Sequence, residues 1–316
     1  MTWSRGAAGD YGIMTYGERW PDTNLSLSAS TFLILKAGMG SAEADYQLGS
    51  DPLELERLNR QGRVLAPATR TILEAAGIRA GMRVLDLGSG MGDMSFAAAD
   101  LVGSAGEVVG IDRSPEPVSR ATHRARQKGL ASVRFIVGDI HDQAPDGPYD
   151  AVIGRLVLMF VPDPAAVLRT QSRLLRPGGL VVPIELDLYT ARALPSTPLV
   201  RQALEWLSEA YKRSGVDPAL GPRLWAVLQQ AGLRPLAMMG VQPHFGHDDP
   251  DGAYILAGIV RTVVPLMERT GVATVAEVAP DTFEERLSAE LAAAAAVFAH
   301  PMLMGAWATN DQARHA

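Results

Sequence analysis

The sequence contains no cysteine in its 316 residues. Disulfide scaffolds, thiolate zinc sites, iron–sulfur clusters and cysteine nucleophiles are therefore excluded. The absence of cysteine is typical of a reducing compartment, and we predict a cytoplasmic protein. Long apolar runs are missing too, since none approaches the ~20 residues needed to cross a bilayer. The first residues also lack the charged start and cleavage pattern of a signal peptide, so we expect no membrane partner.

Positive charge is also scarce. Lys36, Lys128 and Lys212 are the only lysines, and 29 basic residues face 35 acidic ones for a formal net charge of −6. Nucleic-acid binders depend on a basic surface, because neutralising phosphates supplies most of their affinity. We therefore expect no nucleic-acid partner.

Apolar residues make up 47% of the chain, enough for a large core. Five short apolar segments alternate with helical patterns, and two more segments follow late in the chain. This alternation is typical of a parallel sheet covered on both faces. We predict an α/β, Rossmann-like, doubly wound seven-stranded sheet with helical cap insertions and an N-terminal helical leader. The strands are expected at 83–87, 107–111, 133–137, 151–154, 180–184, 236–241 and 302–308.

Composition and hydrophobic periodicity divide the chain into five segments. We expect an irregular extension, a helical leader that closes the ligand site, a Rossmann-like core, a helical cap insertion, and the end of the core sheet with a further insertion at about 250–299. Within the leader, Pro67 predicts a break between two helices, and a late helix is expected over 281–299. The five segments span residues 1–41, 42–80, 81–187, 188–232 and 233–316.

A glycine-rich turn between the first strand and its helix is the strongest motif. Gly88, Ser89, Gly90 and Gly92 let the backbone approach a ligand closely at a helix N-terminus. The dinucleotide fingerprint requires a glycine where this chain has Asp93. An aspartate at that point repels a diphosphate, so the turn favours a ligand that carries a cation.

Carboxylates follow at three successive strand ends. Asp86 lies within the turn, Asp112 ends the second strand, and Asp139 ends the third. An acid at the second strand's end commonly binds ribose hydroxyls. Asp139 could accept a hydrogen bond from an exocyclic amine, and Ile140 could cover a ring face. Together these residues indicate an adenosine with a cationic amino-acid tail.

Five ordered motifs carry a family resemblance. They are DLGSGMG (86–92), VVGIDRS (108–114), VGDI (137–140), YDAVIGRLVLMFVPD (149–163) and LLRPGGLVVPIE (174–185). The chain resembles class I S-adenosylmethionine-dependent methyltransferases, and its leader resembles that of small-molecule, natural-product enzymes. The resemblance implies S-adenosyl-L-methionine as cofactor, a small-molecule acceptor, and methyl transfer to an O, N or C nucleophile by in-line displacement.

The resemblance also assigns site residues. It places Asp86 and the glycine turn at the methionine moiety, and Asp112 with Arg113 at the ribose. The adenine meets Asp139 and Ile140. The remaining candidates are Gly154 and Arg155 beside the sulfonium, and Tyr46 and Gln61 closing the site from above.

The general base, if the acceptor needs one, stays open between His244, His247, His141 and Glu185. The spacing of the histidines is not that of a zinc helix, so no metal site is expected. Two other functions stay open. One is an S-adenosylmethionine-binding protein that does not methylate, such as a cyclase or a regulator, and the other is a nicotinamide oxidoreductase. The oligomeric state is also open, and a homo-oligomer with a swapped leader is one arrangement.

Overall fold

The computed structural model describes residues 52–310 except 143, 145 and 146, and it describes side chains from Arg60 onward apart from Gln61. The expected extension and the first part of the leader lie outside these residues, as does Tyr46. Among the described residues, no helix combines the length and apolar content needed to cross a membrane.

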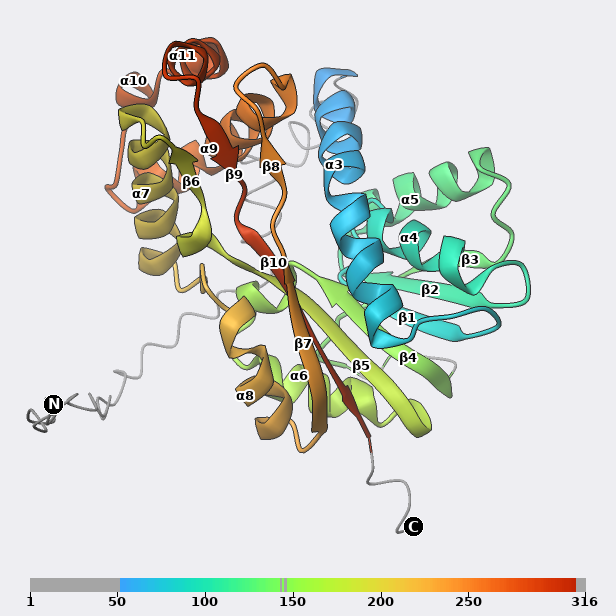
Figure 1. Ribbon diagram of the computed structural model, residues 1–316. Helices are drawn as coiled ribbons and strands as arrows, with labels where there is room; N and C mark the ends of the chain where they lie inside the picture. The colour runs from blue at the N-terminus through green and yellow to red at the C-terminus, as the bar shows by residue number, and fades with distance from the viewer. Residues whose placement is uncertain (1–51, 143, 145–146, 311–316) are drawn as a thin grey trace, which may run out of the picture.

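A seven-stranded sheet forms the centre of the fold (Figure 1), with strand order β3-β2-β1-β4-β5-β10-β7. The first five strands run parallel, while β10 runs antiparallel to both of its neighbours. This confirms the predicted doubly wound α/β sheet. The strands are β1 Arg83–Leu87, β2 Glu107–Asp112, β3 Val133–Val137, β4 Tyr149–Arg155, β5 Leu175–Asp187, β7 Arg234–Val241 and β10 Met302–Thr309.

Helices cover both faces of this sheet because its strands are apolar on both sides. One face buries Leu85 and Val109 under α6 and α8, and the other buries Val84 and Val108 under α3, α4 and α5. Successive residues of β1 thus point to opposite faces, as a period of two requires. These helices are α3 Pro52–Ala76, α4 Asp93–Val102, α5 Pro115–Gln127, α6 Pro164–Ser172 and α8 Leu224–Gln230.

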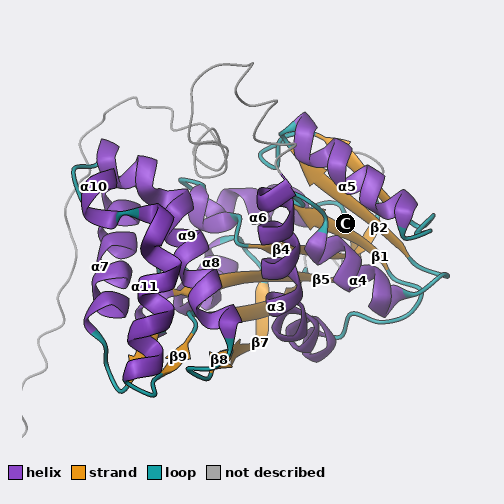
Figure 2. Cartoon of the chain, turned by 90° about the horizontal axis from the view of Figure 1, so that it is seen from above, coloured by secondary structure: helices purple, strands orange, loops and turns teal. Residues whose placement is uncertain are grey.

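A second apolar cluster forms a cap, which stands apart from α4 and α5 in Figure 2. Its members come from helices α7, α9, α10 and α11 and from a small sheet of order β6-β9-β8. Sequence reasoning did not predict this sheet, because its strands have only two or three residues each. The cap elements are β6 Arg192–Leu194, α7 Pro198–Arg213, β8 His244–Phe245, α9 Pro250–Arg269, α10 Val275–Val278, α11 Pro280–Ala293 and β9 Val297–Ala299.

Three local expectations were wrong. Pro67 lies inside one continuous helix, α3, because the buried face with Leu65 and Ile72 packs against the sheet and outweighs the lost hydrogen bond. The late helix ends at Ala293, and strand β9 follows it. Helix α8, expected in the cap, packs against β7 and β10 of the main sheet instead.

Candidate functional site

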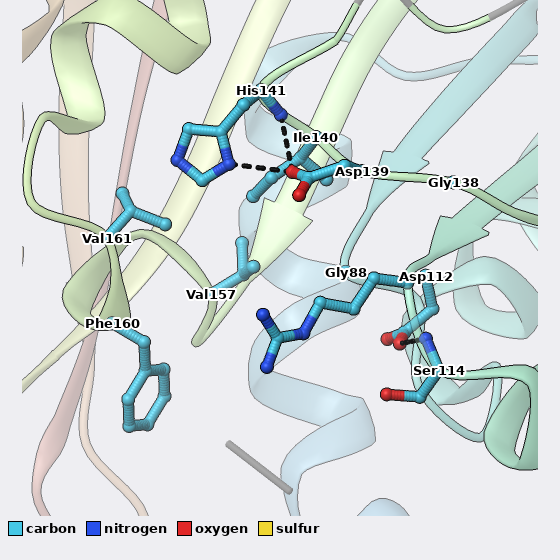
Figure 3. Close-up of a pocket in the computed structure, with 11 residues that line it drawn as sticks. Gly88, Asp112, Ser114, Gly138, Asp139, Ile140, His141, Val157, Phe160 and Val161 are labelled. Atoms are coloured by element: carbon cyan, nitrogen blue, oxygen red, sulfur yellow. Dashed lines mark hydrogen bonds and ion pairs between the residues drawn. The ribbon is translucent and has the colours of Figure 1, made fainter. Parts of the chain in front are cut away.

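A cavity of about 540 Å³ opens at the carboxyl ends of the strands (Figure 3). It lies near the point where the strand order reverses between β1 and β4, the usual ligand crevice of such sheets. The lining residues are Gly88, Asp112, Arg113, Ser114, Gly138, Asp139, Ile140, His141, Val157, Phe160 and Val161.

The glycine turn needs its glycines for conformation and for space. Gly88, Gly90 and Gly92 have φ angles of 63°, 51° and 87°, in the left-handed region that side chains disfavour. A Cβ atom on Gly88 would also collide with the Val157 side chain. The turn therefore leaves backbone, and no side chain, at this edge of the cavity.

Asp86 is a buried carboxyl group with an unused oxygen. Its side chain is 1% exposed, and its Oδ2 accepts a 2.5 Å hydrogen bond from the Ser95 hydroxyl. Its Oδ1 has no hydrogen-bond partner among the residues that the structure describes. Burial raises the pKa of Asp86 to about 7, although the Ser95 hydrogen bond and the charge of Arg155 both lower it. A buried carboxylate with a free oxygen favours a cationic ligand.

Asp112 joins the glycine turn to the second strand. Its Oδ2 accepts a hydrogen bond from Gly90 N–H at 2.9 Å, and its Oδ1 accepts one from Ser114 N–H at 3.0 Å (Figure 3). The side chain is 8% exposed and lines the cavity. Each carboxylate oxygen can accept a second bond, so the group retains capacity for a ligand's hydroxyls.

Asp139 and His141 form a pair at the cavity edge. The Asp139 Oδ1 accepts the His141 N–H at 2.9 Å and lies 2.6 Å from the ring Nδ1 (Figure 3). Partial burial raises the pKa of Asp139, but the His141 hydrogen bonds and the charge of Arg113 lower it overall. Ile140 is buried and lines the same cavity. The end of β3 thus offers an ionised acid beside an apolar surface.

Comparison with known proteins places the chain among methyltransferases. A family model described as a methyltransferase domain matches residues 78–230. Nocamycin O-methyltransferase of Saccharothrix syringae is 41% identical over 117 residues, which cover 36% of this chain and 41% of that protein. Aklanonic acid methyltransferase of a Streptomyces species is 32% identical over 159 residues, which cover 46% of this chain and 72% of that protein. The chain belongs to the S-adenosylmethionine-dependent methyltransferase family.

The matched region of this methyltransferase spans less than half the length of nocamycin O-methyltransferase. Among solved structures, an S-adenosylmethionine-dependent methyltransferase from Aquifex aeolicus has a TM-score of 0.43 at 21% identity, covering 54% of this chain and 82% of that chain.

Asp86 does not line the cavity, but it lies two residues before Gly88, which does, and its chemistry fits the cofactor that the family implies. S-adenosylmethionine carries an ammonium group, and the unpartnered Oδ1 of Asp86 is the acceptor that such a group needs. The glycines at 88, 90 and 92, which have positive φ angles, leave the backbone bare at these positions, so a ligand can approach it closely.

Five of the predicted cofactor residues line the cavity: Gly88, Asp112, Arg113, Asp139 and Ile140. Six others that the structure describes do not line it: Asp86, Ser89, Gly90, Gly92, Gly154 and Arg155. Gly154 is buried against β1. The Arg155 guanidinium donates to Thr69 Oγ1 of α3 at 2.6 Å. Burial lowers the pKa of Arg155, while the charges of Asp93 and Asp86 raise it. Arg155 therefore lies behind Asp86 as a counter-charge. The side chain of Gln61, on α3, is outside the described residues.

Of the four candidate bases, only His141 lines the cavity. Glu185 is fully buried, and its Oε1 accepts the N–H groups of Val157 and Leu158. His244 is exposed in β8, where its Nδ1 lies 2.9 Å from the Gln242 carbonyl oxygen, and His247 follows in the next loop. Among the described residues, no group of three or more potential ligands is placed to hold a metal ion.

Sequence reasoning missed several residues of the candidate site. Ser114, Val157 and Val161 line the cavity, while Ser95 and Thr69 support Asp86 and Arg155. Ser114 directly follows the Asp112-Arg113 pair and could have been included on that ground. Thr69 has no such signal, because 86 positions separate it from Arg155.

Proposed function

We propose that this domain binds S-adenosylmethionine and transfers its methyl group to a small-molecule acceptor. The observation that carries the proposal is the buried carboxyl group of Asp86, whose Oδ1 has no partner within the described part of the chain. Leaving such an oxygen unpaired costs about 1–3 kcal/mol, so it favours a ligand that supplies a donor. The family membership identifies a ligand with a suitable donor, an ammonium group.

The proposal assigns the cofactor's parts to residues at the ends of β1, β2 and β3. Asp86 holds the ammonium group, and the Gly88–Gly92 turn presents its backbone to the methionine moiety. Asp112, already fixed by Gly90 and Ser114, takes the ribose hydroxyls with Arg113 beside it. Asp139 accepts from the adenine amine, and Ile140 covers the ring.

Methyl transfer from this cofactor is chemically easy, because its sulfonium already activates the methyl group for displacement. The protein must hold the acceptor in line and exclude water, which can contribute about 7–11 kcal/mol in favourable cases. Val157, Phe160 and Val161 form an apolar wall on one side of the cavity. This wall removes water from the acceptor and favours an acceptor with apolar surface.

His141 is the candidate base that the geometry supports. Its ring lines the cavity, and Asp139 fixes its orientation through Nδ1, which leaves Nε2 to accept a proton from the acceptor. A positioned base of this kind contributes roughly 10²–10⁴-fold when the acceptor carries a proton. A base serves any acceptor that carries a proton, and among these we propose a hydroxyl acceptor. The name of nocamycin O-methyltransferase, a similar protein, points the same way.

Titration calorimetry with S-adenosylmethionine and, separately, with NADH tests the cofactor. We expect binding of S-adenosylmethionine alone, and binding of NADH alone would contradict the proposal. Transfer of a labelled methyl group to a panel of small hydroxylated acceptors, aklanonic acid among them, then tests the reaction. Cofactor binding without transfer to any acceptor would support a non-methylating protein instead.

A further inference from the structure

Glu185 is a fully buried carboxyl group near the carboxyl end of β5. It lies on β5 opposite Met304 of β10 and is 0% exposed. Its Oε1 accepts two backbone hydrogen bonds, from Val157 N–H at 3.1 Å and from Leu158 N–H at 2.7 Å. Its Oε2 has no hydrogen-bond partner in residues 52–310 as far as these are described. One side chain thus holds two consecutive amides of the segment that follows β4.

That segment makes a sharp turn that needs support. Leu156 has a φ of 55°, a left-handed conformation that is uncommon for a leucine and costs energy unless neighbours enforce it. Its N–H donates to the Ile184 carbonyl at 2.9 Å. The one-turn 3₁₀ helix η1, Leu158–Phe160, follows directly. The carboxyl group of Glu185 therefore holds the first amides of η1 in place just after the strained residue.

The same turn forms one wall of the cavity. Val157, Phe160 and Val161 line it (Figure 3). The Val157 side chain also lies so close to Gly88 that the glycine has no room for a Cβ atom. A displacement of Val157 would therefore move the wall and press on the glycine turn at once.

We infer that Glu185 is a positioning residue for methyl transfer, and that it acts by holding the Val157–Phe160 turn against the glycine turn through Oε1. This inference rests on the proposed function, since it assigns a role within the same site. Glu185 is not a general base, because Oε1 is already engaged by amides and neither oxygen lies among the groups that line the cavity. Burial raises the pKa of Glu185 to about 8, although the amide hydrogen bonds lower it, and Oε1 can accept in either protonation state.

Two substitutions of similar size separate positioning from proton transfer. Glu185→Gln keeps a carbonyl oxygen for the two amides but cannot take a proton, and Glu185→Met removes the acceptor. We expect the glutamine variant to retain at least a third of the wild-type kcat/KM. We expect the methionine variant to bind S-adenosylhomocysteine at least tenfold more weakly and to lose at least tenfold in kcat. Glu285→Gln, an exposed position on α11, is the control and should match the wild type.

Either of two results would overturn the inference. Glutamine and methionine variants that are equally impaired in kcat would show that the charge or proton of Glu185 is needed. A methionine variant with wild-type affinity and kcat would show that the turn does not depend on this carboxyl group.

Amide hydrogen exchange of the wild-type protein tests the same contact without any variant, so misfolding of the methionine variant leaves the question decidable. Strong protection at Val157 and Leu158 supports the inference, and exchange at the rate of an unstructured peptide contradicts it. If the wild type binds no S-adenosylhomocysteine, the proposed function fails, and the exchange result still judges the contact.

Discussion

At the scale of single residues, three aspartates that look alike in the sequence differ in burial and in hydrogen-bond partners. Asp86 is buried with one free oxygen, Asp112 accepts two backbone amides, and Asp139 is half-exposed beside His141. The difference follows from depth along each strand. Asp86 lies within β1 and Asp112 is the last residue of β2, whereas Asp139 lies two residues beyond β3. Burial raises the pKa of the deepest of the three, Asp86, to about 7.

Replacement of Asp112 by alanine should weaken S-adenosylmethionine binding by about 1–3 kcal/mol, because the ribose hydroxyls and two backbone amides lose an acceptor. Calorimetric titration measures the change in affinity. Asp112→Asn should lose less affinity than Asp112→Ala, because asparagine keeps one carbonyl oxygen as an acceptor. Asp100→Ala, an exposed position on α4, serves as the control. An unchanged affinity in Asp112→Ala would show that this carboxylate does not meet the cofactor.

The pKa of Asp86, near 7, predicts a pH dependence of cofactor binding. An ammonium group binds the ionised carboxylate, so below this pKa the site must first lose a proton. Affinity for S-adenosylmethionine should rise by up to about tenfold per pH unit between pH 5.5 and 7. Asp86→Asn should bind more weakly and show no such rise. Parallel pH profiles for wild type and variant would assign the titration to another group.

Candidate binding residues can be predicted from the sequence only where they lie at or just after the end of a strand. Asp86, Asp112 and Asp139 were predicted because the carboxyl ends of neighbouring parallel strands meet at one edge. The contacts of Arg155 with Thr69 and of Glu185 with Val157 were not predictable. Each joins segments that come together only when α3 or the turn after β4 packs against the sheet.

At the scale of elements, packing against the sheet determines that α3 is one continuous helix, against the local preference of proline. Proline in a helix interior costs about 3 kcal/mol, and α3 nevertheless continues through Pro67. Burial of Leu65, Ile72 and Leu73 on the same helix outweighs that cost, since a fully buried aliphatic side chain contributes about 1.5–3 kcal/mol. The two-residue and three-residue strands of the cap sheet were missed because so short a segment shows no period.

The contact between α3 and β10 gives a test of this packing. A Cβ atom on Gly305 would collide with Ile72, and the three atoms nearest to that Cβ all belong to Ile72. Gly305→Ala should therefore lower the free energy of unfolding by about 1–3 kcal/mol. Ile72→Ala alone should lower it by about 2–5 kcal/mol through the cavity it leaves.

The double variant should be more stable than the sum of the two changes predicts, because truncation of Ile72 makes room for the new methyl group. Urea denaturation of the four proteins gives the coupling. Leu73→Ala, equally buried on the same helix, should combine additively with Gly305→Ala. Additivity at Ile72 as well would mean that α3 and β10 do not approach as closely as described.

On the scale of the whole molecule, the cap and the sheet are separate cores joined by a few contacts. Phe160 and Tyr211 pack against clusters of both. Arg60 of α3 forms an ion pair with Asp251 of α9, and its guanidinium lies 4.0 Å from the centre of the Tyr254 ring. Phe160 also lines the cavity, so a shift of the cap relative to the sheet would reach the site through this side chain.

Buried ionisable groups make the stability of the whole molecule depend on pH. Burial raises the pKa of Asp86 from 3.8 to about 7 and that of Glu185 from 4.5 to about 8. The folded state therefore keeps protons that the unfolded chain has already lost, and stability falls as pH rises through these values. Burial lowers the pKa of His300 from 6.5 to about 4. The unfolded chain therefore binds this proton first, and His300 lowers the stability of the folded state as pH drops from 6.5 to 4.

Between pH 6.5 and 8 only the two carboxyl groups of this set act, so the free energy of unfolding of the protein without cofactor should decrease across that range. Urea denaturation at both pH values measures the slope, and Asp86→Asn combined with Glu185→Gln should reduce it while His300→Gln should not. Saturating S-adenosylhomocysteine should oppose the part of the decrease that comes from Asp86, because its ammonium group stabilises the ionised carboxylate. If the double variant keeps the wild-type slope of unfolding free energy against pH, the prediction is wrong, since groups other than Asp86 and Glu185 would then be titrating.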